Sequence, residues 1–496
     1  MTQLGGSPAT ATNRRRAVFL VTALGAFMAS LDLSIVNVAF PALARTFNHD
    51  PRASLAWVVT GYSIVFGALL VIAGRTADRL GSRRVFFTGL AVFCAGSLAS
   101  ALAPSVTILV AGRLVQGAGA AAMLPASLAL LLSAFPAERR SQVVTLWGGI
   151  GALAVATGPS LGALLITGFG WRSAFYVNLP VGLVAWLVGR RVLVDVRSNA
   201  SVGRPDYLGV VLLGTSLAAL VLAIAQGPTW GWGSGRIVGA FVAAVVLQVV
   251  FLWRSARHPE PVLDLSLFTN RSFRVANTVT ILYAMGFFAM LLGNMLFLTG
   301  VWHYSILVAG LAVTPSPLVV AAVSGPAGRA AARFGFRPVL AVGFAVFAGG
   351  LLWFVARISL APHYLTVWLP GSLIIGLGIG LTFPVLSAAA VSSLNQGRFA
   401  VGSAVNQTAR QIGGAVGVAV LVVILGTPRT ASAAMTDFRH LWIYVAALTI
   451  LAGVVSQLLG PTPTRVAPAT DEVLEAAGVE AMVEGDVPVV LSEPRD

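Results

Sequence analysis

The sequence contains fourteen runs of predominantly apolar residues, and this pattern limits the fold more than any other feature. A helix of about 20 apolar residues crosses the hydrocarbon core of a bilayer, and the segments between the runs are too short for a soluble catalytic domain. Only 10% of the 496 residues are charged and 57% are hydrophobic, so charges are too few to cover a water-soluble protein. We therefore predict an all-α polytopic membrane protein with fourteen transmembrane helices, which start near Ala17, Leu55, Val85, Val106, Val143, Phe175, Leu208, Ile237, Ala276, Ile306, Pro338, Leu365, Gly402 and Leu441.

The arginines predict which ends of the helices face the cytoplasm. With the N-terminus inside, the inner segments hold 21 arginines and the outer segments hold 7. An excess of positive charge marks the cytoplasmic side of a membrane protein. We expect a plasma-membrane protein with a cytoplasmic N-terminus at 1–16. The acidic segment 461–496 is expected to be a disordered cytoplasmic tail.

Residue types that are rare or missing exclude several classes of function. All 32 basic residues are arginine, so the chain lacks the lysine of a phosphate-binding nucleotide loop. A single cysteine, Cys94, cannot form an intramolecular disulfide or a cysteine-rich metal site. The net charge of +15 comes from short arginine groups between apolar runs, which indicates membrane topology rather than nucleic-acid binding. We expect no metal, no cofactor and no nucleic-acid partner.

An internal repeat divides the chain into two halves. Residues 74–83 read Gly-Arg-Thr-Ala-Asp-Arg-Leu-Gly-Ser-Arg, and residues 328–337 match them at six of ten positions. Secondary transporters are often built from two such repeated halves. The predicted organisation is a six-helix bundle at 17–190, two linking helices at 207–255 and a second six-helix bundle at 276–460.

Four further motifs accompany the first copy of the loop, at residues 31–41, 113–119, 158–162 and 171–180. Together they resemble the major facilitator superfamily, and within it the fourteen-span drug–proton antiporter branch. The resemblance extends from about residue 15 to about residue 460. It implies the major facilitator fold with helices arranged as 6+2+6. It also implies a monomeric, non-enzymatic exporter of amphipathic small molecules that is driven by the proton motive force.

Asp32 is the one acidic residue deep in a predicted span, where a carboxylate is costly and is rarely kept without a use or a partner. It lies nine residues before Pro41, and Arg113 lies nine residues after Pro104. At 1.5 Å per residue both sit about 13 Å below the outer ends of their helices, so they can form an ion pair. In the family both positions belong to motifs tied to coupling, which implies that Asp32 carries the proton under the control of Arg113. The alternative is an ion pair that only fixes packing.

Gln116 and Gly117 follow Arg113 on the same face of the helix. Gln116 is expected to orient the ion pair. Gly117 is expected to allow the first predicted helix to approach closely.

The loop motif is expected to act in gating. Gly74 and Gly81 are expected to allow tight packing and a sharp turn, and Asp78 is expected to face a neighbouring helix N-terminus or an arginine. The resemblance implies that this contact steadies one conformation, with Asp78 and Arg79 as gating residues. Arg79 and Arg83 belong to the same motif. A topology signal without a gating role is the alternative.

The segment Gly158-Pro159-Ser160-Leu161-Gly162 is predicted to be a proline-weakened, glycine-lined helix at the bundle interface. It resembles the antiporter motif of the family, which is associated with export. The same letters fit the G-x-S-x-G pattern of hydrolases, but all five histidines fall in loops or at span ends. A membrane-embedded enzyme is therefore a remote alternative, and a transporter of one endogenous metabolite is a closer one.

Several polar residues within the spans are candidates for the substrate cavity, or for hydrogen bonds that hold helices together. Arg410 either selects anionic substrates or extends toward the cytoplasm. Because Asp32 is matched by Gly286 in the second half, we expect neutral or singly charged substrates. The cavity candidates are Asn37, Tyr62, Gln116, Tyr283, Asn294 and Arg410, and Asn178, Asn406 and Gln411 are further polar residues of this kind.

Overall fold

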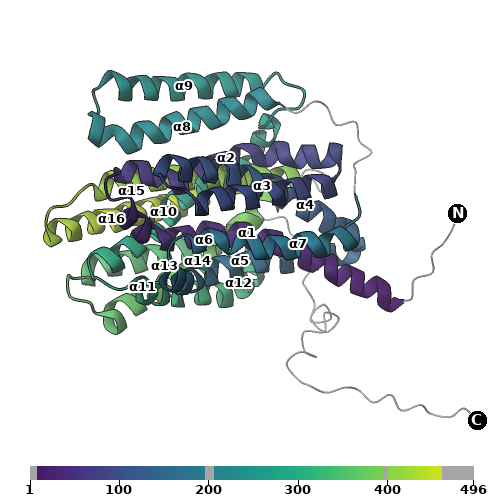
Figure 1. The fold of residues 1–496 in the computed structure, drawn as a ribbon. Helices are drawn as coiled ribbons and strands as arrows, with labels where there is room; N and C mark the ends of the chain where they lie inside the picture. The colour runs from purple at the N-terminus through teal and green to yellow at the C-terminus, as the bar shows by residue number, and fades with distance from the viewer. Residues whose placement is uncertain (1–7, 196–205, 393, 395–398, 461–496) are drawn as a thin grey trace, which may run out of the picture. The chain divides into compact units, whose positions relative to one another are not determined.

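The computed structural model describes residues 8–195, 206–392, 394 and 399–460, and within them the secondary structure consists of helices and turns (Figure 1). The predicted cytoplasmic tail at 461–496 lies outside the described residues, as does the start of the predicted N-terminal segment. The described residues belong to one compact unit.

The first half of the chain supplies seven described helices that pack around α1 and α4. Helix α4 packs between α2 and α3, and α1 packs against α4, α5 and α7. The short α6 and α7 together occupy the predicted run near Phe175. The bounds are α1 Pro8–Thr46, α2 Arg52–Leu80, α3 Ser82–Ala101, α4 Val106–Ala134, α5 Ala137–Phe169, α6 Ser173–Tyr176 and α7 Asn178–Val192.

Helices α8 (Tyr207–Trp230) and α9 (Gly235–Ser255) form a hairpin beside the rest of the helices (Figure 1). Helix α8 packs against both α2 and α15, while α9 contacts α8. Asp206, which is fully buried, accepts a hydrogen bond from the backbone N–H of Gly209 (2.8 Å) and pairs with Arg254 Nε (2.6 Å). This acid therefore caps α8 and ties the two ends of the hairpin together.

The second half repeats the arrangement of the first. Helix α10 packs against α15 and α16, and α14 packs between α12 and α13. The run predicted from Ile306 is divided in two because Pro315 lacks the N–H that would continue the first helix. The bounds are η1 Leu265–Thr269, α10 Arg271–Gly300, α11 Ile306–Val313, α12 Pro315–Phe334, α13 Phe336–Arg357, η2 Tyr364–Trp368, α14 Leu369–Ser392, α15 Phe399–Leu425 and α16 Ala431–Ser456.

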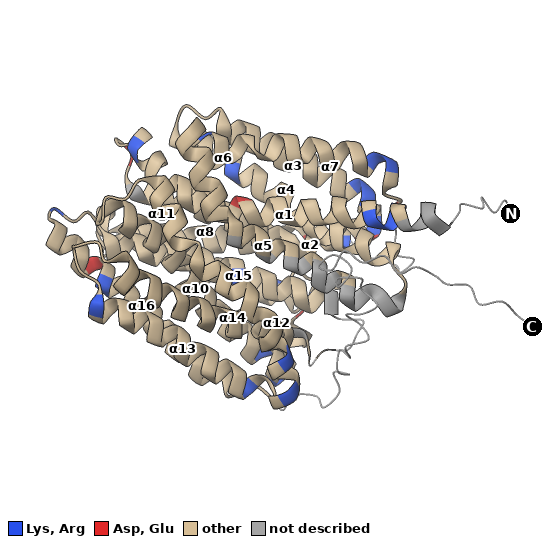
Figure 2. Cartoon of the chain, turned by 90° about the horizontal axis from the view of Figure 1, so that it is seen from below, with Lys and Arg blue, Asp and Glu red and all other residues tan. Residues whose placement is uncertain are grey.

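Twelve helices in the described part of the chain are long and apolar enough to cross a membrane. The two remaining predicted runs fall on α5, which has 33 residues, and on α6 and α7, which have 4 and 15 residues. Figure 2 shows the arginines gathered at the helix ends, with the middle of the helices largely uncharged. The all-helical, multi-span class is confirmed, and the count of fourteen stays a prediction.

The two copies of the loop motif have the same backbone turn. Gly81 and Gly335 have φ angles of 103° and 89°, a region that favours glycine, and in each copy the next helix begins at the following residue. The repeat recognised in the sequence therefore extends to local conformation.

Candidate functional site

Asp32 and Arg113 form an ion pair inside the first half of the chain. Arg113 Nη1 on α4 lies 2.5 Å from Asp32 Oδ2 on α1, and the two side chains are 1% and 0% exposed. The contact expected from their matching depths is therefore present. Because both charges are sealed from solvent, neither is screened by water.

Two amide side chains complete the shell of the carboxylate. Gln116 Nε2 donates to Asp32 Oδ1 (2.8 Å), and Asn178 Nδ2 on α7 donates to the same oxygen (3.4 Å). Ser97 Oγ on α3 accepts from both amides, at 3.3 Å from Gln116 and 3.0 Å from Asn178. It donates in turn to the carbonyl of Phe175 (2.8 Å). The predicted orienting role of Gln116 fits this geometry, whereas Ser97 was not singled out from the sequence.

Arg113 is held on its other sides by α2 and by aromatic rings. Its Nε donates to the carbonyl of Val58 (2.9 Å), and Nη1 also donates to Gln116 Oε1 (2.6 Å). The guanidinium carbon lies 4.2 Å from the centre of the Tyr62 ring and 5.8 Å from that of Phe175. A cation over a ring face is attracted by its negative quadrupole, so Tyr62 supports the arginine.

Close approach of α4 to α2 brings these groups together. A Cβ on Gly117 would lie 2.7 Å from the backbone oxygen of Tyr62. The expectation that Gly117 admits the first helix is therefore wrong, since the backbone it approaches is that of α2. The reason is helical rotation: Gly117 follows Arg113 by one turn, and that face of α4 also meets Val58 and Tyr62.

Gly117→Ala is expected to destabilise the protein by about 1–3 kcal/mol, because an added methyl group must push α4 away from α2. The measurement is the thermal unfolding midpoint of the purified protein in detergent. Gly239→Ala on α9 is the matched control, since nothing lies within 4 Å of a Cβ there. An equal midpoint for Gly117→Ala and the wild type would contradict the packing described here.

Helix α5 presents its glycines to α1. A Cβ on Gly158 would lie 2.5 Å from Ser34 Cβ, and one on Gly162 would lie 2.6 Å from Ile35 Cγ1. Ser34 Oγ donates to the carbonyl of Val155 (3.1 Å). The expected glycine lining is therefore present, but these two glycines face α1 of the same half rather than the predicted interface between the bundles.

The opposite side of α5 contacts the second half of the chain. The Pro159 carbonyl oxygen would lie 2.7 Å from a Cβ on Gly310 of α11. The hydroxyls of Ser160 and Thr314 are 2.5 Å apart. Helix α5 thus joins α1, which carries Asp32, to the other half.

The acid of the first loop motif has one of its two expected partners: the charge of Arg75 on its own helix acts on Asp78, but Asp78 does not lie at the N-terminus of the neighbouring helix. Asp78 is exposed at the end of α2, and the carboxylate at the N-terminus of α3 is instead that of Asp195, whose Oδ1 accepts from the backbone N–H of Arg83 (3.2 Å). Arg83 Nη2 also donates to the Arg190 carbonyl (3.1 Å). Asp195 follows α7, and its approach to α3 depends on how these two helices pack.

Among the described residues, Gly74 and Arg79 of the same motif make no close contact with a neighbouring helix. A Cβ on Gly74 would lie 3.6 Å from Pro125 Cβ, which is an ordinary contact distance. The expectation that tight packing requires a glycine at this position is therefore wrong. Arg79 is exposed. The sharp turn at Gly81 is the part of the packing expectation that the geometry supports.

The remaining cavity candidates lie in different surroundings. Asn37 Nδ2 donates to the Leu33 carbonyl of its own helix (2.7 Å), and Asn294 Oδ1 accepts from Trp442 Nε1 (3.1 Å). Asn294 therefore joins α10 to α16. Tyr283 is buried in an aromatic cluster, and Arg410 Nη2 donates to Ser387 Oγ (3.0 Å).

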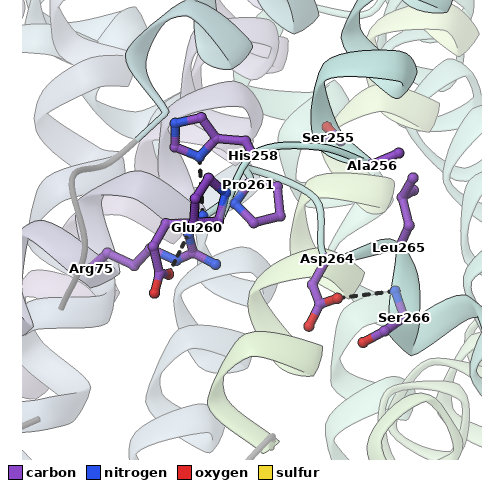
Figure 3. Close-up of a pocket in the computed structure, with 10 residues that line it drawn as sticks. Arg75, Ser255, Ala256, His258, Glu260, Pro261, Asp264, Leu265 and Ser266 are labelled. Atoms are coloured by element: carbon purple, nitrogen blue, oxygen red, sulfur yellow. Dashed lines mark hydrogen bonds and ion pairs between the residues drawn. The ribbon is translucent and has the colours of Figure 1, made fainter. Parts of the chain in front are cut away.

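A polar cavity of about 490 Å³ lies where the end of α2 meets the segment between α9 and η1. Figure 3 shows Arg75 paired with Glu260 there, at 3.0 Å between Nη1 and Oε2. His258 Nδ1 accepts from the backbone N–H of Glu260 (3.1 Å), and Asp264 Oδ1 accepts from that of Ser266 (3.0 Å). Because Arg75 belongs to the loop motif, this ion pair connects the motif to the segment that follows the linking hairpin.

Comparisons with known proteins agree with the fold and the motifs. Residues 22–206 match the model of the Major Facilitator Superfamily. The chain is 35% identical over 418 residues to the Multidrug resistance protein Stp of Mycobacterium tuberculosis, covering 83% of this chain and 76% of that protein. It is 32% identical over 443 residues to the Methylenomycin A resistance protein of Streptomyces coelicolor, covering 89% and 90%.

Solved structures show the same fold at low sequence identity. The inward-open xylose transporter XylE from E. coli is 15% identical and has a TM-score of 0.62, with 93% of this chain and 99% of that chain covered. The POT family transporter PepTSo is 16% identical with a TM-score of 0.64, covering 90% and 97%. The chain belongs to the major facilitator superfamily, and its relatives include proteins named for multidrug and antibiotic resistance.

Proposed function

We propose that this protein is a proton-coupled antiporter that exports amphipathic small molecules, with Asp32 as the residue that binds and releases the proton. The observation that carries the proposal is the fully buried Asp32 carboxylate, which takes hydrogen bonds from Arg113, Gln116 and Asn178. An ionisable side chain buried among membrane-spanning helices is costly and usually marks a functional site.

Protonation of Asp32 removes the negative charge that holds Arg113. Arg113 keeps its bonds to the Val58 carbonyl and to Gln116 Oε1, so α4 stays attached to α2 while its grip on α1 weakens. Each proton that moves down 100 mV supplies about 2.3 kcal/mol, which sustains roughly a fifty-fold substrate gradient.

Helix α1 offers a short route from the carboxylate to the other half of the protein. Ser34 and Ile35, two and three residues after Asp32, pack on Gly158 and Gly162 of α5. Helix α5 in turn contacts α11 where Pro159 meets Gly310, and Ser160 contacts Thr314, the residue that follows α11. A shift of α1 on protonation therefore changes the contact between halves, which is the movement that alternating access requires.

The direction of transport is supported by the relatives and by the α5 motif. Besides the two proteins above, a relative in Streptomyces glaucescens is named the Tetracenomycin C resistance and export protein, at 31% identity and covering 82% of this chain and 75% of that protein. We therefore propose export, with protons entering from outside and substrate leaving the cytoplasm.

The topology that fits this function has fourteen spans. In it α5 and α7 cross the membrane with the twelve other spans, α8 and α9 link two six-helix bundles, and both termini are cytoplasmic in a plasma-membrane monomer. The loop motif then acts in gating, through the turn at Gly81 and the ion pair of Arg75 with Glu260.

Expression in an efflux-deficient bacterium is expected to lower the accumulation of at least one antibiotic or fluorescent dye, and a protonophore is expected to abolish the difference. The comparison is with an empty vector, by fluorescence or by mass spectrometry of washed cells. Lower accumulation that survives the protonophore would contradict proton coupling. Unchanged accumulation across a broad panel would contradict drug export, and raised accumulation would indicate uptake.

A further inference from the structure

Arg410 is a cation held inside the second half of the chain. It lies nine residues after Val401, where the span of α15 begins, which is about 14 Å along the helix. Its guanidinium carbon is 4.4 Å from the centre of the Phe383 ring, and Nη2 donates to Ser387 Oγ (3.0 Å). Both partners lie within the span Tyr364–Ala390, so the side chain does not extend past the helix ends.

The position of Arg410 is fixed by the packing of α15 on α10. One turn before it, Asn406 Nδ2 donates to Thr280 Oγ1 (2.8 Å). One turn after it, a Cβ on Gly413 would lie 2.5 Å from the Ile281 carbonyl oxygen. Arg410 therefore lies on the stripe of α15 that faces α10.

Arg113 has a carboxylate, that of Asp32, as its countercharge, whereas Arg410 has none among the described residues. Among the residues that the structure describes, ion pairs join Arg113 to Asp32, Arg75 to Glu260 and Arg254 to Asp206, and no carboxylate pairs with Arg410. Ser387 takes one of the five guanidinium N–H donors. Arg410 is partly exposed, unlike Arg113, which is sealed from solvent.

Aromatic rings lie beside this cation. Tyr283 stacks on Phe287, with centroids 5.5 Å apart and planes at 13°, and its centroid lies 6.2 Å from that of Phe383. Phe287 and Phe383 are both partly exposed. A cation next to an apolar, aromatic surface is the chemistry that recognises an amphipathic anion.

We propose that Arg410 binds the anionic group of the exported molecule, and that the substrates of this protein are amphipathic monoanions such as aromatic carboxylates. The carboxylate pairs with the guanidinium, and the apolar body packs on Phe287 and Phe383, behind which Tyr283 is buried. This inference rests on the proposed export function. The charge of Asp32 is already paired with that of Arg113, so Asp32 offers no free countercharge to a cationic substrate.

The test uses three probes with the same apolar body: naphthylacetate, its neutral amide and naphthylethylammonium. Export is measured in proteoliposomes with an imposed pH gradient, and binding of radiolabelled naphthylacetate is measured by equilibrium dialysis on the full-length protein in nanodiscs. The variants are Arg410→Gln and Arg410→Lys. The matched control is Arg357→Gln, because Arg357 is exposed at the end of α13.

The wild type is expected to prefer the anion over its amide by about tenfold or more, the value of a charge-assisted hydrogen bond. Arg410→Gln should lose that preference and keep transport of the amide, while Arg410→Lys should keep part of it and Arg357→Gln all of it. An anion preference that survives in Arg410→Gln would overturn the proposal, as would an equal loss of all three probes or export that excludes the anion. Arg410-dependent binding without export of any probe or drug would overturn the export function and leave the anion site standing.

Discussion

Asp32→Asn is expected to leave a folded protein that no longer exports substrate against a gradient. Asparagine has the shape of a protonated aspartic acid and keeps an oxygen acceptor for Gln116 or Arg113, but it cannot bind or release a proton. Arg113 also keeps the Val58 carbonyl, the Gln116 oxygen and the Tyr62 ring. Accumulation in an efflux-deficient host should therefore rise to the level of the empty vector. The substrate gradient that is lost is up to about fifty-fold for each 100 mV of driving force.

The matched control is Asp50→Asn, because Asp50 is exposed between α1 and α2. That variant should export like the wild type. Membrane yield and the thermal midpoint separate a loss of coupling from a loss of folding. Protonophore-sensitive export by a well-expressed Asp32→Asn protein would contradict the role assigned to Asp32.

Arg113→Ala is expected to cause the largest loss of stability of the substitutions considered, about 3–5 kcal/mol, since it leaves the Asp32 carboxylate buried without a countercharge. It also removes the group that packs on the Tyr62 and Phe175 rings. Arg113→Lys is not a conservative change, because one ammonium group cannot reproduce the separate bonds to Val58, Asp32 and Gln116. The measurement is thermal unfolding in detergent, together with membrane yield.

A double variant tests how much of this loss comes from the unpaired charge of Asp32. Asp32→Asn combined with Arg113→Gln removes both charges, so it should recover much of the stability lost in Arg113→Ala without restoring transport. A double-mutant cycle over Asp32 and Arg113 measures the coupling between them. Additive effects at a distance of 2.5 Å would show that the ion pair contributes nothing to stability.

The sequence indicates that the ion pair is possible because helical rise is constant. Asp32 and Arg113 each lie nine residues from a proline near the same end of their helices, which fixes their depth. The spacing does not give their lateral approach, so from the sequence the pair is only possible, and the resemblance bears on its role in coupling. The same argument could not find Ser97, because the rotation of α3 about its axis depends on packing that apolar runs do not encode.

Other expectations were wrong where several helices decide the contact. Gly117 approaches α2 rather than α1, and Asp195 rather than Asp78 lies at the start of α3. These contacts join residues that are far apart in the chain, so no local spacing predicts them. The last helix begins at Ala431, ten residues before the predicted start at Leu441. The predicted start is late because Asp437 and Arg439 interrupt the apolar pattern in the first turns of this helix.

The most direct test of the central claim is to measure proton movement in proteoliposomes that carry a pH-sensitive dye inside. The substrate is one that the accumulation assay has identified. Adding it should drive protons across the membrane with the wild type. The Asp32→Asn protein should exchange labelled for unlabelled substrate without moving protons. Substrate-driven proton movement by Asp32→Asn, at the rate of the wild type, would show that another group carries the proton.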